Sequence, residues 1–386
     1  MDLTALRAAL ADTAQRAHVP GMSLAVVSRD RVLFSGGTGY ADLNALTPAT
    51  AGTVYPWFSM TKPLTATAAL RLSDQGLLEL QAPVHEYLDW LRAPGPVQPT
   101  VWQLLTHSSG LGNPLPVKWI HPADAPGPDQ EGMLRKLMAR RRPFRYRVGG
   151  RGHYSNVGYL VAAQIISQVS GEPFTSYVQR EILGPLGMDS TGFSYPPGRP
   201  SATGYVRIPR PIAPVLARVL PPGTLGSRPG SYSSINPFLV DGAGYGGLVG
   251  TVLDAAEFAR LHLNDGLAVP PETVAGPYAS GASEATGASG ASVASEGRRI
   301  LLESTARAMR DIHVKGTQFD HSAGWFRKHT NGPHGSYVEH FGTGLGFWNI
   351  MRLYPERGRG IVIMSNSTTS YDYATLFSLI LRMPWT

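Results

Sequence analysis

The first part of the chain carries one helical hydrophobic pattern followed by two strand-like patterns. In residues 1–19 the apolar positions recur at helical spacing and fall near one face, which predicts an amphipathic helix: Leu3, Leu6, Ala9, Leu10 and Ala14. Two β-prone apolar runs follow at 22–28 and 31–35, separated by Arg29-Asp30. This pairing predicts a β-hairpin directly after the helix.

Helical spacing dominates the middle of the chain. Residues 62–75 repeat apolar side chains with a helical period, and Gly76 supplies a C-terminal cap. Pro63 is tolerated only in a first turn, so Ser59 is expected at or just before the start of this helix. Further helices are predicted at 100–105, 157–169 and 252–263, whereas the Pro-, Gly- and Ser-rich stretch 196–237 predicts an irregular loop region.

The C-terminal part returns to strands. Residues 337–341, 346–353 and 360–365 are strand-like, 356–358 predicts a turn, and 372–381 predicts a closing helix. Strands at both chain ends with helices between them predict an α+β fold. We expect one antiparallel sheet flanked by helices, built from 1–58 and 245–386, with a mainly helical domain inserted at 59–244.

Residues 275–297 differ from the rest of the chain. They are almost entirely Ala, Ser, Gly, Glu and Thr, a composition that cannot build a core. We interpret them as a low-complexity mobile insert on the surface, with a role as a lid as the alternative.

Composition places the 386-residue chain among globular proteins and excludes several classes. Hydrophobic residues make up 42% and charged residues 16%, and the absence of Cys excludes disulfides and thiolate metal sites. The formal charge is +7, but the Arg-rich stretch 135–151 has no nucleic-acid-binding motif, so a solvated surface is favoured over a nucleic-acid site. No run approaches the roughly 20 apolar residues of a membrane span, and residues 1–19 do not resemble a signal peptide. We therefore expect a cytoplasmic protein without nucleic-acid or membrane partners.

Ser59-Met60-Thr61-Lys62 is the first candidate for chemistry. Positions three apart share a helix face, so the Lys62 amine can reach the Ser59 hydroxyl. A neutral amine can remove the hydroxyl proton and create a nucleophile, provided that burial lowers the Lys pKa from about 10.4. The spacing alone is weak, because such pairs also arise by chance.

Two further segments offer partners for such a nucleophile. Tyr154-Ser155-Asn156 provides a phenol whose pKa an ammonium would lower, suited to a proton shuttle, and an amide for a substrate carbonyl or for Lys62. His340-Phe341-Gly342-Thr343 follows a strand-like run, where Gly342 allows close backbone approach and the Thr343 N–H can pair with the Ser59 N–H as an oxyanion hole. Taken singly, Tyr154 also fits a packing aromatic and His340 a structural histidine.

These three segments, in this order, resemble the serine β-lactamase and penicillin-binding-protein superfamily, and most of all class C β-lactamases and family VIII carboxylesterases. The resemblance spans nearly the whole chain and is supported by further stretches: Val19-Pro20-Gly21-Met22, Phe58–Lys62, Leu104–Leu111, Tyr154–Tyr159 and Gly246-Gly247-Leu248. It implies a nucleophilic Ser59, a base Lys62 and a proton-shuttling Tyr154. It also implies substrate contacts at Asn156, His340, Gly342 and Thr343, an oxyanion hole at the backbone of Ser59 and Thr343, and neither metal nor organic cofactor. His107, within the stretch Leu104–Leu111, is interpreted as a turn-stabilising residue.

One departure from the family pattern guides the substrate assignment. Lactam-handling relatives usually carry Lys-Thr-Gly at the third segment, where this chain has His340-Phe341-Gly342. A histidine therefore replaces the permanent cation that would anchor a substrate carboxylate, and the anchor is weakened. We therefore expect a carboxylesterase acting on a small-molecule ester or amide. A β-lactamase, a D-aminopeptidase or amide hydrolase, an acyltransferase and a non-catalytic binding protein remain alternatives, and the oligomeric state stays open.

The sequence does not distinguish residues of an acyl pocket from residues of the core. Five aromatic residues are candidates either for that pocket or for the core: Tyr55, Trp57, Trp119, Trp325 and Trp348. An ordinary α/β-hydrolase is not supported, since the chain has no Gly-x-Ser-x-Gly elbow.

Overall fold

The fold is built around one antiparallel sheet whose strands come from both ends of the chain. In the computed structural model, residues 3–114, 119–139, 142–209, 211–212, 218–269, 297–329 and 334–385 are described. The sheet has eight strands in the order β12-β13-β14-β15-β16-β1-β2-β3, and all neighbours run antiparallel. The strands span β1 Gly21–Val27, β2 Val32–Asp42, β3 Thr47–Pro48, β12 Asp320–His321, β13 Phe326–Arg327, β14 Val338–Gly344, β15 Phe347–Tyr354 and β16 Arg359–Ser365.

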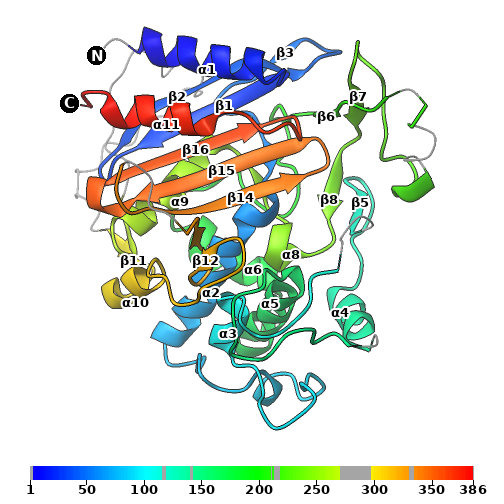
Figure 1. The fold of residues 1–386 in the computed structure, drawn as a ribbon, viewed down its shortest axis with the longest axis vertical. Coiled ribbons are helices and arrows are strands. Elements are labelled where there is room, and N and C mark those ends of the chain that lie inside the picture. The colour runs from blue at the N-terminus through cyan, green and yellow to red at the C-terminus, as the bar shows by residue number, and fades with distance from the viewer. Residues whose placement is uncertain are drawn as a thin grey trace, which may run out of the picture.

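Strand β1 shows why this sheet is covered on both faces. All seven of its residues are buried, and successive side chains point to opposite sides. Leu24 and Val26 pack into a core with helices α1 (Thr4–Arg16) and α11 (Tyr373–Arg382), which lie side by side over one face (Figure 1). Ala25 and Val27 pack into a second, larger core on the other face, where α9 (Val252–Leu263) lies against β1 and β16.

The remaining helices gather below the sheet in Figure 1, on the side of the larger core. They are α2 Thr61–Asp74, α3 Val101–Leu105, α4 Gln130–Met138, α5 Asn156–Ser170, α6 Phe174–Val178, α8 Ala243–Gly246 and α10 Glu303–Ala308. Helix α2 is buried almost all round, which is the pattern of a central core helix rather than of a surface helix. The predicted α+β fold, with a sheet from both chain ends and helices between, is confirmed. The domain boundaries at 58/59 and 244/245 remain a prediction.

Four short antiparallel strand pairs lie outside the eight-stranded sheet in the described part of the chain. They are β4 (Tyr55–Pro56) with β9 (Val249–Gly250), β5 (Ile120–Pro122) with β8 (Phe238–Val240), β6 (Gly204–Val206) with β7 (Ser233–Ile235), and β10 (Leu267–Ala268) with β11 (Arg298–Arg299). The first pair matters most for the position of Ser59. It joins the segment just before Ser59 to the segment just after α8, and the Trp57 N–H donates to the Leu248 carbonyl at 2.8 Å.

Most helix and strand predictions differ from the structure only at their ends. The helix expected at 62–75 begins at Thr61 and ends at Asp74, and Thr100 is the N-cap of α3 rather than its first residue. The hairpin strand expected at 31–35 is longer, because small residues let β2 continue along β1 as far as Gly39. In the turn expected at 356–358, Gly358 has φ +57°, a conformation that favours glycine.

Two predicted segments, 196–237 and 275–297, need separate comment. The stretch 196–237, expected to be irregular, contains the antiparallel β6–β7 pair, which short-range patterns cannot predict because its strands are far apart in sequence. Of the low-complexity insert at 275–297, all but Gly297 lies outside the described residues. Within the described ranges, no helix combines the length and the apolar character needed to cross a bilayer.

Candidate active site

Ser59 lies in a single turn of 3₁₀-helix, Phe58–Met60, that leads directly into α2. Phe58, the residue before it, has φ +48°, an unusual conformation for a non-glycine residue that recurs at functional sites. Trp57 and Met60 are fully buried, so the turn is held by the core while Ser59 itself is partly exposed. The hydroxyl therefore sits at the N-terminus of a buried helix, where the helix dipole favours negative charge.

Lys62 follows one turn later and points at the Ser59 hydroxyl, as the spacing predicts. Its Nζ donates to Ser59 Oγ at 2.9 Å and to the backbone carbonyl of Tyr245, in α8, at 3.0 Å. The side chain is completely buried, and this burial holds the pKa of Lys62 well below its usual value. When the amine is neutral, the same 2.9 Å contact allows Nζ to accept the hydroxyl proton of Ser59, which is what general-base activation requires.

Three tyrosine rings surround the Lys62 amine. Their centroids lie 4.8 Å (Tyr154), 5.6 Å (Tyr159) and 5.3 Å (Tyr245) from Nζ. Such rings attract a cation, so they oppose the effect of burial and would stabilise a transient ammonium. Tyr245 was not predicted from the sequence. It directly precedes Gly246-Gly247-Leu248, a stretch that supports the family resemblance, and this position was the signal that could have indicated it.

Tyr154 reaches Ser59 from the loop that precedes α5. Its hydroxyl is hydrogen-bonded to Ser59, and this bond lowers the pKa of Tyr154, whereas burial of the phenol raises it by more. The net shift is upward, opposite to the sequence expectation of a pKa lowered by an ammonium. The physical reason is that burial of the phenol, which disfavours the phenolate, outweighs the stabilising bond from Ser59. Tyr154 is thus a neutral hydroxyl, able to relay a proton.

His107 and Ser155 hold the Tyr154 segment in place. Ser155 caps α5: its Oγ accepts from the Gly158 N–H at 3.1 Å and donates to the Gly112 carbonyl at 3.0 Å. The Ser155 N–H donates to Nδ1 of His107 at 3.1 Å, and the His107 ring packs 4.6 Å from the ring of Tyr154. His107 thus contacts the predicted catalytic segment directly, while burial keeps its pKa well below the usual value and the imidazole neutral.

Asn156 is the first residue of α5 and lies beside this segment. Its N–H donates to Oδ1 of Asn113 at 3.0 Å. Its own buried Oδ1 has no hydrogen-bond partner within the described part of the chain. The alternative that Asn156 holds Lys62 does not match this geometry, since Lys62 uses the Tyr245 carbonyl instead. A buried amide without a partner is available to a bound substrate.

Strand β14 brings the third predicted segment against the Ser59 turn. A Cβ on Gly342 would lie 2.0 Å from the Trp57 carbonyl oxygen, so only glycine allows this approach. Thr343 is exposed and pairs with Trp348 in the sheet register. The expected oxyanion hole between the N–H groups of Ser59 and Thr343 fits this approach and remains a prediction.

His340 is buried in β14 with its ring centroid 6.0 Å from that of Tyr154. Its Nδ1 lies 2.8 Å from the Phe341 carbonyl, which can only accept, so Nδ1 carries the hydrogen and Nε2 presents a lone pair. Nε2 has no partner among the described residues, and burial, followed by the proximity of Lys62, holds the pKa of His340 well below its usual value. His340 is therefore a hydrogen-bond acceptor toward the site and not a cationic anchor.

The aromatic candidates separate clearly. Tyr55, Trp57 and Trp325 are completely or almost completely buried and belong to the larger core. Trp348 packs on the opposite face of the sheet, with α1 and α11. The Trp119 ring lies 5.8 Å from that of Tyr245, whose carbonyl binds Lys62. Among the described residues, no group of three or more His, Asp and Glu side chains is placed to hold a metal ion.

Comparisons with known proteins agree with this architecture. The structure superposes on the octameric penicillin-binding protein homologue from Pyrococcus abyssi with a TM-score of 0.76 and 22% identity, covering 99% of this chain and 77% of that one. It also superposes on the D-amino acid amidase from Ochrobactrum anthropi SV3 (TM-score 0.71, 23% identity, 95% and 92% covered). A third match is EstCE1, a hydrolase with promiscuous acyltransferase activity (TM-score 0.72, 20% identity, 99% and 98% covered).

Sequence comparison gives the same result. Protein flp from Staphylococcus aureus strain COL is 24% identical over 362 residues, which cover 92% of this chain. The chain spans about three fifths of the length of that relative, since the match covers 61% of it. The sequence model of the family named Beta-lactamase matches residues 6–380, nearly the entire chain. The protein therefore belongs to the Beta-lactamase family.

Proposed function

We propose that this protein is a serine hydrolase that cleaves carboxylic esters through an acyl-enzyme on Ser59. The observation that carries the proposal is the 2.9 Å hydrogen bond between Ser59 Oγ and a completely buried Lys62 whose pKa is lowered. A nucleophile, a base within reach and a mechanism for keeping that base neutral are thus present together.

Acylation follows from the positions of the three side chains. Ser59 Oγ attacks the ester carbonyl carbon while its proton moves to Lys62 Nζ, and the N–H groups of Ser59 and Thr343 are assigned to the oxyanion. The carbon–oxygen bond to the alcohol then breaks. Tyr154 gives its proton to the leaving oxygen and regains one from the Lys62 ammonium, which leaves Lys62 neutral.

Deacylation reverses the same proton path. A water molecule attacks the acyl carbon, and its proton passes through Tyr154 and Lys62 to the departing Ser59 Oγ. We assign to Asn156 Oδ1 and His340 Nε2 hydrogen bonds from N–H or O–H groups of the substrate outside the ester, because both acceptors are buried and lack partners among the described residues. Gly342 contributes by letting β14 approach closely.

An ester is favoured over a lactam because the third segment supplies a neutral acceptor where lactam-handling relatives carry a cation. An amide is the second candidate, supported by the fold shared with the D-amino acid amidase. Acyl transfer is a variant of the same chemistry, supported by the fold shared with EstCE1. An alkoxide leaves more readily than an amide nitrogen, so the ester requires the least help from Tyr154.

Intact-protein mass spectrometry combined with chromophore release tests the proposal. The wild-type chain, Ser59→Ala and the control Ser73→Ala on the same helix are incubated with p-nitrophenyl butyrate and, separately, with nitrocefin. We expect ester turnover by the wild type and by Ser73→Ala, and none by a folded Ser59→Ala. Full ester turnover by Ser59→Ala would falsify the assignment of the nucleophile.

The other outcomes separate the alternatives. Rapid nitrocefin turnover reassigns the protein to the lactamases. A lasting adduct on Ser59 points to an acyltransferase that lacks its acceptor. If neither reagent gives an adduct or releases its chromophore, the catalytic proposal is contradicted. A binding protein on this fold is then favoured.

A further inference from the structure

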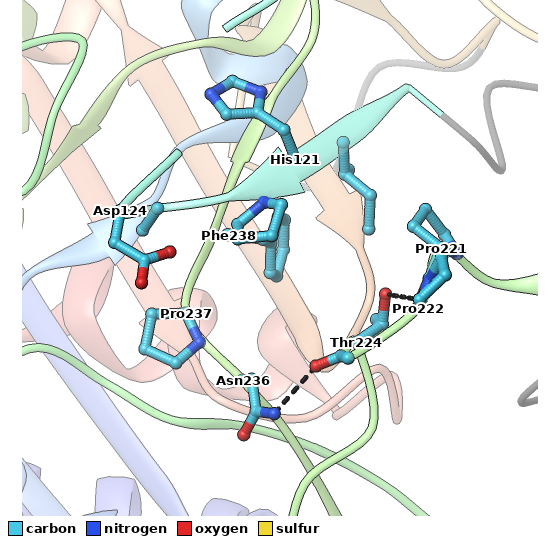
Figure 2. Close-up of a pocket in the computed structure, with 12 residues that line it drawn as sticks. His121, Asp124, Pro221, Pro222, Thr224, Asn236, Pro237 and Phe238 are labelled. Atoms are coloured by element: carbon cyan, nitrogen blue, oxygen red, sulfur yellow. Dashed lines mark hydrogen bonds between the residues drawn. The ribbon is translucent and has the colours of Figure 1, made fainter. Parts of the chain in front are cut away.

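A cavity among the described residues lies beside the Ser59 turn and is lined by none of the residues assigned to catalysis. It measures about 510 Å³ and is lined by β5, by β8 and by the turn at 221–224. Cavities of roughly 300–1,000 Å³ accommodate small organic ligands. Figure 2 shows Asp124, Pro237, Asn236, Thr224 and Phe238 among the residues that line it.

Phe238 connects this cavity to the nucleophile. Its ring lies 6.0 Å from the ring of Phe58, the residue directly before Ser59, and it also lines the cavity. The other end of the β5–β8 strand pair is linked to Lys62 through Trp119 and Tyr245. There the Asp241 N–H donates to the Trp119 carbonyl at 2.8 Å, and Trp119 packs on Tyr245, whose carbonyl binds Lys62.

The contacts that lead from Ser59 to the cavity run through two rings, Phe58 and Phe238, whose centroids lie 6.0 Å apart. A substrate bound at Ser59 therefore reaches the cavity only if its acyl group extends past both rings. Short acyl groups end before it.

The lining of the cavity indicates the chemistry of the group that it accepts. Pro222, Pro237 and Phe238 present apolar surface, and Asp124 contributes an exposed carboxylate to the lining. None of the described residues that line it is Lys or Arg, although the chain as a whole carries a formal charge of +7. Within the described part of the chain, Asp124 forms no ion pair, so its charge is available to a ligand. An apolar chain that ends in an ammonium group matches both features.

We propose that the cavity binds the far end of the acyl group that is transferred to Ser59, and that it selects medium-length acyl chains ending in an ammonium group. This specificity rests on the proposed hydrolase function. Phe238 and the flanking prolines would contact the apolar body of the chain, while Asp124 would pair with the terminal ammonium.

A substrate series tests the proposal. We would measure kcat/KM for p-nitrophenyl esters of butyric, octanoic and 8-aminooctanoic acid. Wild type should prefer 8-aminooctanoate over butyrate by tenfold or more, since each buried methylene is worth about fourfold. Ala123→Phe, which fills the cavity, should remove most of this ratio, whereas Ala125→Phe, outside the lining, should keep it.

The role of the negative charge on Asp124 is tested separately. Asp124→Asn should lower the ratio of 8-aminooctanoate to octanoate by about two- to fivefold, as expected for an exposed ion pair. The exposed Asp129→Asn, which does not line the cavity, should leave it unchanged. Equal kcat/KM for all three esters in wild type, or equal ratios in Ala123→Phe and wild type, would overturn the proposal.

A binding measurement on a variant that cannot turn over substrate tests the cavity independently of the hydrolase proposal. Octylammonium is titrated into Ser59→Ala and into Ser59→Ala carrying Ala123→Phe, followed by NMR. Binding that Ala123→Phe abolishes supports the cavity assignment whether or not any ester is cleaved. Absence of binding to Ser59→Ala, or equal binding to both variants, refutes it even if butyrate is hydrolysed through Ser59.

Discussion

At the scale of single residues, the site depends on opposing influences on Lys62. Complete burial removes the amine from water and favours the neutral form, while three tyrosine rings and two oxygen acceptors favour the ammonium. The effect of burial is the larger one, and it holds the pKa of Lys62 well below its usual value. The same surroundings can still stabilise the ammonium that forms briefly during proton transfer.

Activity should therefore rise with pH on the acid side. The fraction of neutral Lys62 increases as the pH rises through its lowered pKa, so kcat/KM for p-nitrophenyl butyrate should increase and then level off. No alkaline loss from Tyr154 is expected until well above pH 10, since its pKa is raised. A pH–rate profile of the wild type checks this. Lys62→Arg should be inactive throughout, because a guanidinium stays protonated, and an active Lys62→Arg would exclude Lys62 as the base.

Tyr154→Phe isolates the proton relay from packing. The ring and its contacts with His107 and Lys62 are retained, but the hydroxyl that bonds Ser59 is lost. We expect kcat to fall by about 10²–10⁴-fold with little change in melting temperature, measured by steady-state kinetics and circular dichroism. A loss below about tenfold would show that Tyr154 only packs.

At the scale of elements, the start of α5 determines where the tyrosine and the asparagine lie. Ser155 stands between Tyr154 and Asn156, caps the helix and bonds the backbone of a neighbouring loop. His107 accepts the Ser155 N–H from the left-handed conformation at φ +59°. One cap thus orients two predicted site residues at once.

Ser155→Ala should therefore cost both stability and activity. Loss of an N-cap lowers the free energy of unfolding by about 0.5–2 kcal/mol, and the released segment should lower kcat as well. Thr251→Ala is the matched control, because Thr251 caps α9 through a bond from the Asp254 N–H and lies outside the assigned site. Urea unfolding and ester kinetics of both variants are compared. If both variants lose activity equally, the effect belongs to general destabilisation and not to the position of Tyr154.

At the scale of the whole molecule, one sheet assembled from both chain ends carries the site on one side. Helices α1 and α11 cover the face away from the site, and the larger core with α2 and α9 fills the other. That larger core also encloses polar groups such as His262, which is fully buried between Phe258 and Trp325. Such groups couple the stability of the whole fold to pH.

His262 should make the protein less stable in mild acid. Burial, aided by Arg310 and opposed by Asp265, lowers the pKa of His262 to about 3, whereas unfolded His titrates near 6.5. Between these values only the unfolded state binds the proton, so the free energy of unfolding should fall as the pH drops from about 6.5 toward 3. Urea unfolding at pH 7 and pH 5 measures the loss. His262→Phe should lose less between these two values, and an equal loss would assign the pH dependence to other groups.

The resemblance to the family and the local elements were accessible from the sequence because they depend on short-range patterns. The three-residue spacing of Ser59 and Lys62, the helix that follows them and the strands near both ends need only neighbouring residues. Helices 156–170 and 252–263 were predicted to within one residue at each end. The sequence also suggested that Tyr154 and the His340 segment belong with Ser59, by order and resemblance rather than by any local signal.

Only the tertiary structure decided how these groups behave. The lowered pKa of Lys62 and of His340, the raised pKa of Tyr154 and the Tyr245 carbonyl on Lys62 all arise from packing between distant segments. The β6–β7 pair and the cavity beside Phe238 are likewise products of long-range contact. A sequence specifies which groups are present and which lie one turn apart. Burial, which sets their protonation and their available lone pairs, exists only once those distant segments enclose them.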